Sequence, residues 1–199
     1  MKKVIIYIHG KDGSPTEAER YRAVCPGFDV IGLDYVSDNP WDAAEEFPRL
    51  FDEIAKKYSS VTVIANSIGA YFSLCALGDK KIDRALFVSP VVDMERLITD
   101  MMSWAGVSEE KLKEEKLIPT PFGISLSWEY LSYIRSHPFT WRIPTDILYG
   151  GRDELIARDT ILSFAEKHGA SLSIMESGVH WFHTDEQLSF LDKWVRTHI

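Results

Sequence analysis

Short apolar runs recur along the chain, and stretches with helical spacing separate them. Each run is nearly continuous in apolar residues and lacks the alternation that marks a strand with one face in water. Strands of this kind are buried on both faces, as in a parallel sheet that is covered by helices. The pattern predicts strands over residues 4–8, 28–33, 61–65, 85–88, 146–149 and 171–175.

Helical patterns connect these runs. An apolar stripe at three- and four-residue steps predicts an amphipathic helix over 41–58, in which Pro48 predicts a kink or a later helix start. Residues 68–77 are apolar almost all round, which is typical of a buried central helix. Thr16 and Glu19 have the spacing of a capping box. The predicted class is α/β, a three-layer α/β/α sandwich with a mostly parallel sheet of about six strands.

The alternation of strands and helices is interrupted once, over residues 93–144. This segment has no strand pattern and is far longer than most connections in α/β domains. We expect one domain over residues 1–199, in which 93–144 forms a helical lid insertion. The segment is rich in aromatic residues, which make rigid apolar walls. The candidate substrate-binding residues within it are Trp104, Phe122, Trp128 and Tyr133.

Composition and charge narrow the possible partners. The formal net charge of −8 disfavours nucleic acid, because an acidic surface repels phosphate backbones. No apolar run reaches the ~18 residues of a membrane span. Cys25 and Cys75 are too few for a disulfide framework and indicate a cytoplasmic protein with reduced thiols. No H-E-x-x-H sequence, cysteine pair or P-loop occurs, so we expect no metal and no nucleotide cofactor.

The chemistry of the chain centres on Ser67, which stands between the predicted strand 61–65 and the predicted helix 68–77. Ala65 and Gly69 flank this serine at two residues on either side, as a tight strand-to-helix turn requires. Such a turn raises the hydroxyl above the carboxyl edge of the sheet, beside helix N-terminal amides that favour an oxyanion. The alternative is that Ser67 only caps the helix.

This turn resembles the nucleophile elbow of the α/β-hydrolase superfamily, although Ala65 replaces the first glycine of G-x-S-x-G. In that superfamily an acid and then a histidine follow the serine in the chain. The resemblance implies that Asp153, after a strand that ends in glycines, is the acid, and that His180, before the last helix, is the base. Asp93 and His183 are the alternatives for these two roles.

The first loop, His9-Gly10-Lys11, is similar to the H-G loop of the same superfamily. The resemblance implies that the backbone amides of Lys11 and Ile68 bind the oxyanion, whereas His9 braces the loop. The implied activity is hydrolysis of an ester or thioester of a small, partly apolar molecule, through an acyl-enzyme and without a cofactor. A peptidase or carbon–carbon bond hydrolase with the same three residues is an alternative, as is a binding protein that retains the fold.

Overall fold

Six parallel strands form the central sheet of the computed structural model, which describes residues 2–199. The strand order is β2-β1-β3-β4-β7-β8. The bounds are β1 Lys3–Ile8, β2 Asp29–Gly32, β3 Ser60–Asn66, β4 Arg84–Val88, β7 Thr145–Gly150 and β8 Ser171–Met175. All neighbouring strands pair in parallel. The predicted α/β sandwich with a sheet of about six strands is confirmed.

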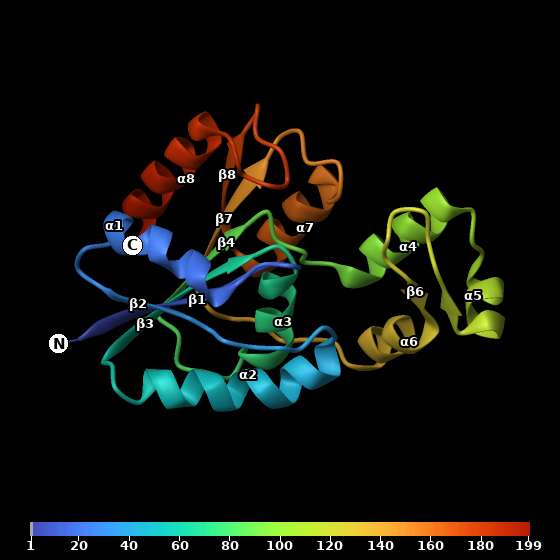
Figure 1. The fold of residues 1–199 in the computed structure, drawn as a ribbon, viewed down its shortest axis with the longest axis horizontal. Helices are drawn as coiled ribbons and strands as arrows, with labels where there is room; N and C mark the ends of the chain where they lie inside the picture. Colours follow the sequence, from blue (N-terminus) through green and yellow to red (C-terminus); the bar gives the residue numbers. More distant parts are fainter. Residues whose placement is uncertain (1) are drawn as a thin grey trace.

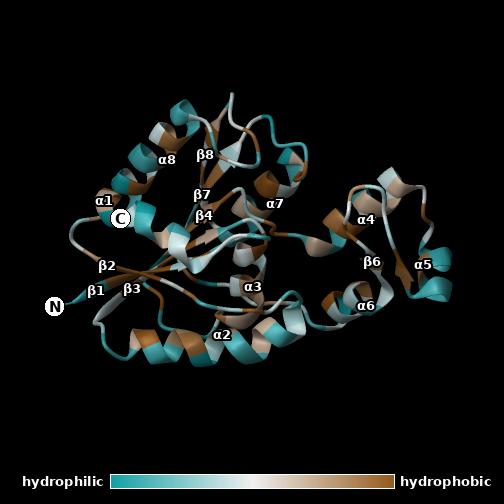
Figure 2. Cartoon of the chain, in the orientation of Figure 1, coloured by the Kyte–Doolittle hydropathy of each residue, from teal (hydrophilic) through white to brown (hydrophobic). Residues whose placement is uncertain are grey.

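Helices cover both faces of this sheet (Figure 1). Helices α1 (Glu19–Val24) and α8 (Asp185–His198) pack on one face, against Ile5, Ile64 and Leu86. Helices α2 (Pro40–Ala55), α3 (Ile68–Ala76) and α7 (Arg158–His168) pack on the other, against Ile6, Val63 and Phe87. These six strand side chains are fully buried. The apolar strands lie in the middle of the molecule (Figure 2), as strands covered on both faces must.

The chain changes direction across the sheet between β2 and β3. After β1 it forms the edge strand β2, and it then returns to pair β3 along the other side of β1. Ligands in open α/β sheets bind at the carboxyl ends of the strands at such a switch point. Ile8 of β1 is in register with Ala65 of β3, so the residues that follow, Gly10 and Ser67, meet there. A Cβ atom on Gly10 would lie 3.3 Å from the Cβ of Ser67.

Helix α2 contains Pro48 within its length. The helix begins at Pro40 and continues through Pro48 without a break, so there is no later start. Asn39 caps it, because its side-chain oxygen accepts the amide of Asp42 at 2.8 Å. Pro48 removes one helical hydrogen bond. Burial of the neighbouring Phe47 against the core offsets that loss.

The capping box near the first helix also differs from the expectation. It is formed by Ser14 and Glu17, and not by Thr16 and Glu19. The Ser14 amide donates to Glu17 Oε1 at 3.0 Å, and the Ser14 hydroxyl accepts from the chain at the start of a 3₁₀ turn, η1 (Pro15–Ala18). The proline at the first position of that turn moves the start of the helical segment two residues earlier than the spacing predicts.

Residues 93–144 form a separate lobe beyond the carboxyl edge of the sheet (Figure 1). The lobe contains α4 (Met94–Ala105), α5 (Glu109–Glu115), β5 (Leu117–Ile118), β6 (Leu126–Ser127) and α6 (Trp128–Ser136). Strands β5 and β6 pair antiparallel, so this segment includes a short hairpin that the sequence pattern does not indicate. Arg135 of α6 binds Glu95 of α4 and Glu109 of α5, both at 2.7 Å, and so links the three helices.

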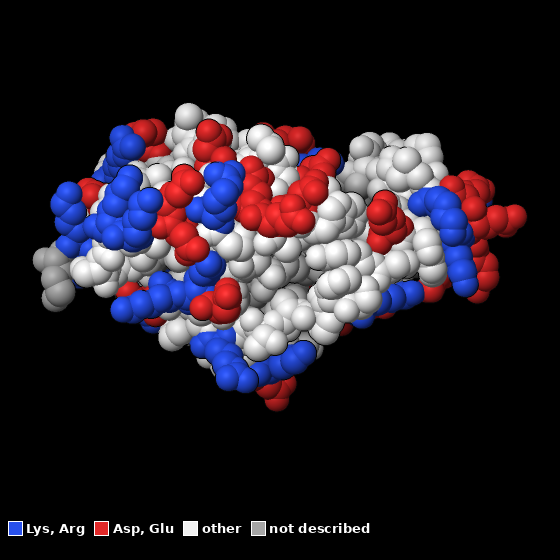
Figure 3. Space-filling model, turned by 90° about the horizontal axis from the view of Figure 1, so that it is seen from below, with Lys and Arg blue, Asp and Glu red and all other residues white. Residues whose placement is uncertain are grey.

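The surface carries both signs of charge. Lys and Arg side chains lie among Asp and Glu side chains over much of the face seen in Figure 3. Within residues 2–199, the longest apolar helical stretch falls short of what crossing a bilayer would require.

Candidate active site

Ser67 occupies a strained turn between β3 and α3. Its φ and ψ are 48° and −119°, a conformation that a serine adopts only when the surroundings enforce it. The Ser67 amide donates to Val88 O at 3.1 Å, and Val91 N donates to Ser67 O at 3.0 Å. Gly69 lets the helix approach β1 closely, because a Cβ atom there would lie 2.2 Å from the carbonyl oxygen of His9. The turn holds the serine hydroxyl at the switch point.

The hydroxyl of Ser67 is the first member of a hydrogen-bonded chain of three side chains. Ser67 Oγ lies 2.9 Å from His180 Nε2. His180 Nδ1 lies 2.7 Å from Asp153 Oδ2. The side chains of His180 and Asp153 are 4% and 0% exposed, so water does not compete for this contact. The structure thus brings the three candidate residues together from segments far apart in the sequence.

The loop after β7 holds Asp153 in place. The second carboxylate oxygen, Oδ1, accepts the amides of Leu155 and Ile156, each at 2.9 Å. The buried Tyr149 hydroxyl donates to Ile156 O at 2.7 Å and fixes the far side of the loop. Burial raises the pKa of Tyr149 to about 12, so this hydroxyl keeps its proton at neutral pH. One carboxylate oxygen of Asp153 therefore accepts hydrogen bonds from its own loop, and the other faces His180.

Glycines allow the acid loop and the histidine loop to pack against each other. A Cβ atom on Gly150 would lie 2.8 Å from the carbonyl oxygens of Gly178 and Val179. The amide of Arg152 donates to Gly178 O at 2.8 Å. This direct backbone contact sets the position of His180 relative to Asp153.

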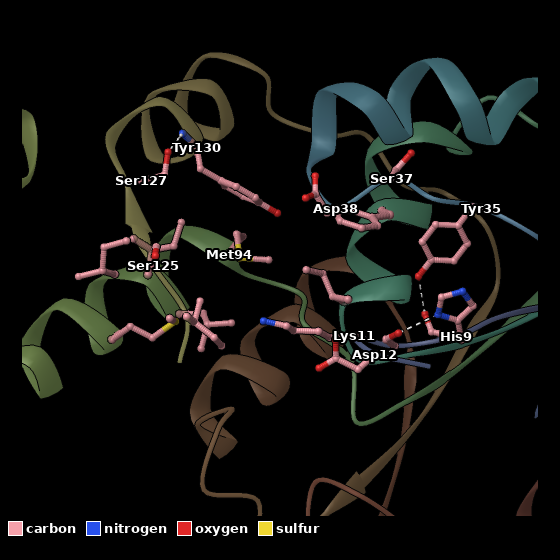
Figure 4. Close-up of a pocket in the computed structure, with 18 of the residues that line it drawn as sticks. His9, Lys11, Asp12, Tyr35, Ser37, Asp38, Met94, Ser125, Ser127 and Tyr130 are labelled. Atoms are coloured by element: carbon pink, nitrogen blue, oxygen red, sulfur yellow. Dashed lines mark hydrogen bonds between the residues drawn. The ribbon is translucent and has the colours of Figure 1, made fainter. Parts of the chain in front are cut away.

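The first loop passes beside the serine, and Gly10, Lys11 and Ser67 line one pocket. Tyr35 donates its hydroxyl hydrogen to His9 O at 2.8 Å, and its ring stacks on the imidazole of His9 at a centroid distance of 4.2 Å. His9 Nδ1 lies 2.8 Å from Gly10 O (Figure 4). The histidine therefore braces the loop from within. The amide of Lys11 follows Gly10, and the amide of Ile68 begins α3, where N–H groups have no helical acceptor.

The two alternative residues lie in other surroundings. Asp93 is exposed and caps α4, since its carboxylate accepts the amide of Arg96 at 2.9 Å. His183 is exposed, and its Nδ1 lies 2.5 Å from Trp181 O. In the part of the chain that the structure describes, neither side chain hydrogen-bonds to a member of the Ser67 chain.

Comparison with solved structures identifies the architecture. Alpha/beta hydrolase domain-containing protein 10 from mouse superposes with a TM-score of 0.81 at 14% identity, over 98% of this chain and 88% of that one. Est1E from Butyrivibrio proteoclasticus gives 0.77 at 15% identity, over 98% and 86%. The thioesterase domain from the curacin biosynthetic pathway gives 0.60 at 15%, over 98% and 91%. The chain has the α/β-hydrolase fold. No protein-family model matches the sequence, and no curated protein matches it in sequence.

In this α/β-hydrolase fold, a cavity of about 520 Å³ lies between the sheet edge and the lobe formed by residues 93–144 (Figure 4). The first loop and the start of α3 form its base, with Lys11 and Ile68 among the lining residues. Eight of the lining residues have aliphatic or methionine side chains. They are Val36, Ile68, Met94, Leu97, Ile98, Met101, Ile124 and Leu126. Charged groups of the first loop and of Asp38 lie on the same wall. Tyr130 of α6 also lines the cavity, and burial raises the pKa of its hydroxyl, which is therefore neutral.

The lid aromatics that we expected in this wall lie elsewhere among the described residues. The rings of Trp104 and Phe122 pack edge-on with their centroids 6.2 Å apart, and the two residues are 53% and 41% exposed. Trp128 lies beneath the Lys113 ammonium, and Tyr133 packs edge-on against Trp41. The candidates were chosen by residue type, whereas the direction in which each side chain points decides contact with the cavity. Tyr130 was not among those candidates, and the stripe of apolar residues along α4 is the signal that could have located the wall.

A second, smaller pocket of about 250 Å³ lies on the other side of the first loop. Ser67 and His180 both line it, together with Glu17, Asn66 and Ser89. Gly10, Lys11 and Asp12 line both cavities and therefore separate them. The Ser67 hydroxyl thus faces the smaller pocket beside the histidine, whereas the next residue, Ile68, lines the larger cavity.

Other reactive groups take no part in this arrangement. Burial raises the pKa of the Cys75 thiol to about 11, which keeps it a thiol at neutral pH. Among residues 2–199, no three His, Cys, Asp or Glu side chains are grouped as ligands of a metal ion would be.

Proposed function

We propose that this protein is a serine hydrolase that cleaves an ester or thioester of a small, partly apolar substrate through an acyl-enzyme. One observation carries the proposal. The Ser67, His180 and Asp153 side chains form a continuous chain of contacts at 2.9 and 2.7 Å, at the carboxyl edge of an α/β-hydrolase sheet. This is the arrangement that activates a hydroxyl nucleophile.

Acylation follows from the positions of these groups. His180 Nε2 accepts the proton of Ser67 as the hydroxyl oxygen attacks the carbonyl carbon of the substrate. Asp153 holds the tautomer in which Nδ1 carries a hydrogen, and it stabilises the imidazolium that forms. The amides of Lys11 and Ile68 stabilise the oxyanion, a contribution of about 3–4 kcal/mol for each donor of this kind. The imidazolium then gives its proton to the leaving group, and the carbon–oxygen or carbon–sulfur bond breaks.

Deacylation repeats these steps with water as the nucleophile. His180 takes a proton from the water, whose oxygen attacks the acyl carbon. The bond to Ser67 Oγ breaks, and the proton returns to that oxygen. The products are a carboxylic acid and an alcohol or thiol, and every proton is carried by the single histidine.

The apolar cavity under the lid supports an apolar acyl group in the substrate. At about 520 Å³ it falls within the range of ~300–1,000 Å³ for small-molecule sites. Its wall of aliphatic and methionine side chains excludes water from an alkyl or aryl chain. The thioesterase domain from the curacin pathway, which has this fold, is consistent with a thioester substrate as well as an ester.

Labelling with a fluorophosphonate tests this function directly. The wild-type protein should be labelled on Ser67, and it should hydrolyse aryl esters of short acids. Ser67→Ala should abolish the labelling and lower kcat by roughly 10⁴–10⁶. A buried hydroxyl on the neighbouring helix α3 provides the control, since Ser73→Ala should label normally. A wild-type protein that neither labels nor hydrolyses any ester would contradict the proposal.

A further inference from the structure

The direction of proton transfer assigns the two cavities to the two halves of the substrate. His180 Nε2 must protonate the leaving group, so the leaving group lies on the side of the histidine. That side is the smaller pocket, which His180 lines together with Trp181. The acyl group then extends in the other direction, past the amide of Ile68, into the larger cavity.

Ser89 gives the smaller pocket a buried hydroxyl that lacks a partner. This residue is 2% exposed, and its Oγ has no hydrogen-bond partner among the described residues. Its φ of 42° is an uncommon value for a residue with a side chain. An unpaired buried hydroxyl destabilises the folded chain, and strained residues cluster where a ligand is held. A hydroxyl group on a bound molecule would supply the missing partner.

Asn66, which lines the same pocket, has an unpaired acceptor. The Tyr7 hydroxyl donates its one hydrogen to Glu17 Oε2, so its oxygen accepts from Asn66 Nδ2 at 2.9 Å. This fixes the orientation of the amide group. The other end of the amide, Asn66 Oδ1, is buried and has no partner within residues 2–199. The acceptor is suited to a molecule that brings hydrogen-bond donors.

Two carboxylates at the rim of the smaller pocket add a constraint on charge. Asp12 and Glu17 both line it, and both residues are exposed. Lys11 also lines the smaller pocket, but its side chain extends away from it, toward residues 93–144 and into the larger cavity (Figure 4). Anionic leaving groups would be repelled, whereas neutral groups with O–H donors would be attracted.

Building on the proposed serine hydrolase function, we propose that the smaller pocket binds the alcohol part of an ester, and that this alcohol carries further hydroxyl groups, as glycerol does. The bond that breaks joins the acyl carbon to one alcohol oxygen, which takes the proton from His180. The remaining hydroxyl groups bond to Ser89 Oγ and Asn66 Oδ1. Esters and thioesters whose leaving group carries phosphates, such as thioesters of coenzyme A, are poor substrates.

Two butyrate esters with leaving groups of similar size provide the first test. For the wild-type protein, kcat/KM for 1-monobutyrylglycerol should exceed that for propyl butyrate by about tenfold. Ser89→Ala should reduce this ratio to about three, because one of two equivalent contacts remains and their factors multiply. Ser163→Ala removes an exposed hydroxyl of α7 outside both cavities and should keep the wild-type ratio. A wild-type ratio near one, or a ratio that Ser89→Ala does not change, overturns the inference.

A partitioning measurement gives the same information without a variant. Glycerol should intercept the butyryl-enzyme and form monobutyrylglycerol several-fold faster than 1-propanol at equal concentration forms propyl butyrate. Equal rates for the two alcohols overturn the inference.

A matched pair of butyryl thioesters tests whether the smaller pocket rejects anionic leaving groups. Butyryl-N-acetylcysteamine and butyryl-coenzyme A share one thioester bond, and only the second carries phosphates. We expect kcat/KM to be at least tenfold lower for the coenzyme A thioester, and Asp12→Asn with Glu17→Gln to narrow that gap. Equal values for the two wild-type reactions overturn the constraint. Failure of fluorophosphonate labelling removes the serine hydrolase function itself, whereas cleavage of propyl butyrate with a ratio near one removes only this inference.

Discussion

Gly69→Ala tests whether the close approach of α3 to β1 creates the reactive geometry. An added Cβ would lie 2.2 Å from His9 O, whereas carbon and oxygen normally stay about 3.3 Å apart. The His9 carbonyl cannot retreat freely, because the Tyr35 hydroxyl holds it at 2.8 Å. The N-terminus of α3 must therefore move by about 1 Å. That shift displaces the Ser67 hydroxyl and the Ile68 amide, which the proposed mechanism places next to the reacting carbonyl.

Both stability and catalysis should respond to this shift. Overpacking of this kind destabilises a protein by about 1–3 kcal/mol, which corresponds to a fall in Tm of about 2–12 °C for a chain of this length. Misplacement of reacting groups by about 1 Å lowers the rate by about 10²-fold. Thermal denaturation followed by circular dichroism would measure the first effect, and kcat/KM for an aryl butyrate would measure the second.

A second glycine provides the control. Gly27 lies in the turn before β2, and a Cβ atom there would meet nothing within 4 Å. Gly27→Ala should leave both Tm and kcat/KM near the wild-type values. A Gly69→Ala protein with wild-type Tm and wild-type kcat/KM would refute the reasoning, since it would show that α3 accommodates the methyl group without moving the site.

Four further perturbations separate the parts of the site. His180→Ala should lower kcat by about 10⁴–10⁶ and His183→Ala by less than about threefold; equal losses in ester hydrolysis would reverse the assignment of the base. Asp153→Asn should lower kcat by about 10⁴ while labelling of the serine persists slowly, and full activity would exclude the acid role. Ile124→Trp narrows the larger cavity, so it should reduce kcat/KM for octanoate esters about tenfold more than for acetate esters. Equal reductions would show that the acyl chain lies outside this cavity. Burial raises the pKa of the Cys25 thiol from 9.0 to about 11. The contribution of the protonated Cys25 thiol to the free energy of unfolding is therefore complete below about pH 9 and is lost as the pH rises through about 11. The urea midpoint should fall over that interval, and it should fall less in Cys25→Ala.

The sheet could be predicted because burial on both faces leaves a direct record in the sequence. Continuous apolar runs such as residues 61–65 have few alternatives to a covered parallel strand once glycines and helical segments bound them. The turn at Ser67 could be located for a related reason. Only small residues fit where α3 passes within contact of β1, and Gly69 is such a residue. The catalytic roles of Ser67, Asp153 and His180 stay predictions that the variants above examine.

The wall of the lid cavity could not be read in the same way, because it depends on how helices are oriented and not on which residues they contain. Met94, Ile98 and Met101 follow the spacing of one helical face, and that face lies against the cavity and the core. Trp104 is one turn further along and points to solvent, since the helix ends there. Aromatic content predicts that a segment buries apolar surface. It does not predict whether a given ring faces a substrate or a neighbouring helix.

The polar character of the smaller pocket has a different origin, which no local pattern records. Asn66, Ser89 and Glu17 come from three separate segments that the strand order β1-β3-β4 places side by side. In the local sequence, Asn66 is the end of a strand, Ser89 is a turn residue and Glu17 belongs to a helix cap. The unpaired atoms of Asn66 and Ser89 become visible only when the sheet brings these segments together around His180. In the proposed function, the acyl half of the substrate therefore meets surface to which residues 93–144 contribute, and the leaving half meets polar groups at the ends of the strands. Exchanging lid segments should accordingly change acyl preference while the preference between glycerol and propanol esters persists, and a lid variant that altered both preferences together would show that the two cavities act as one.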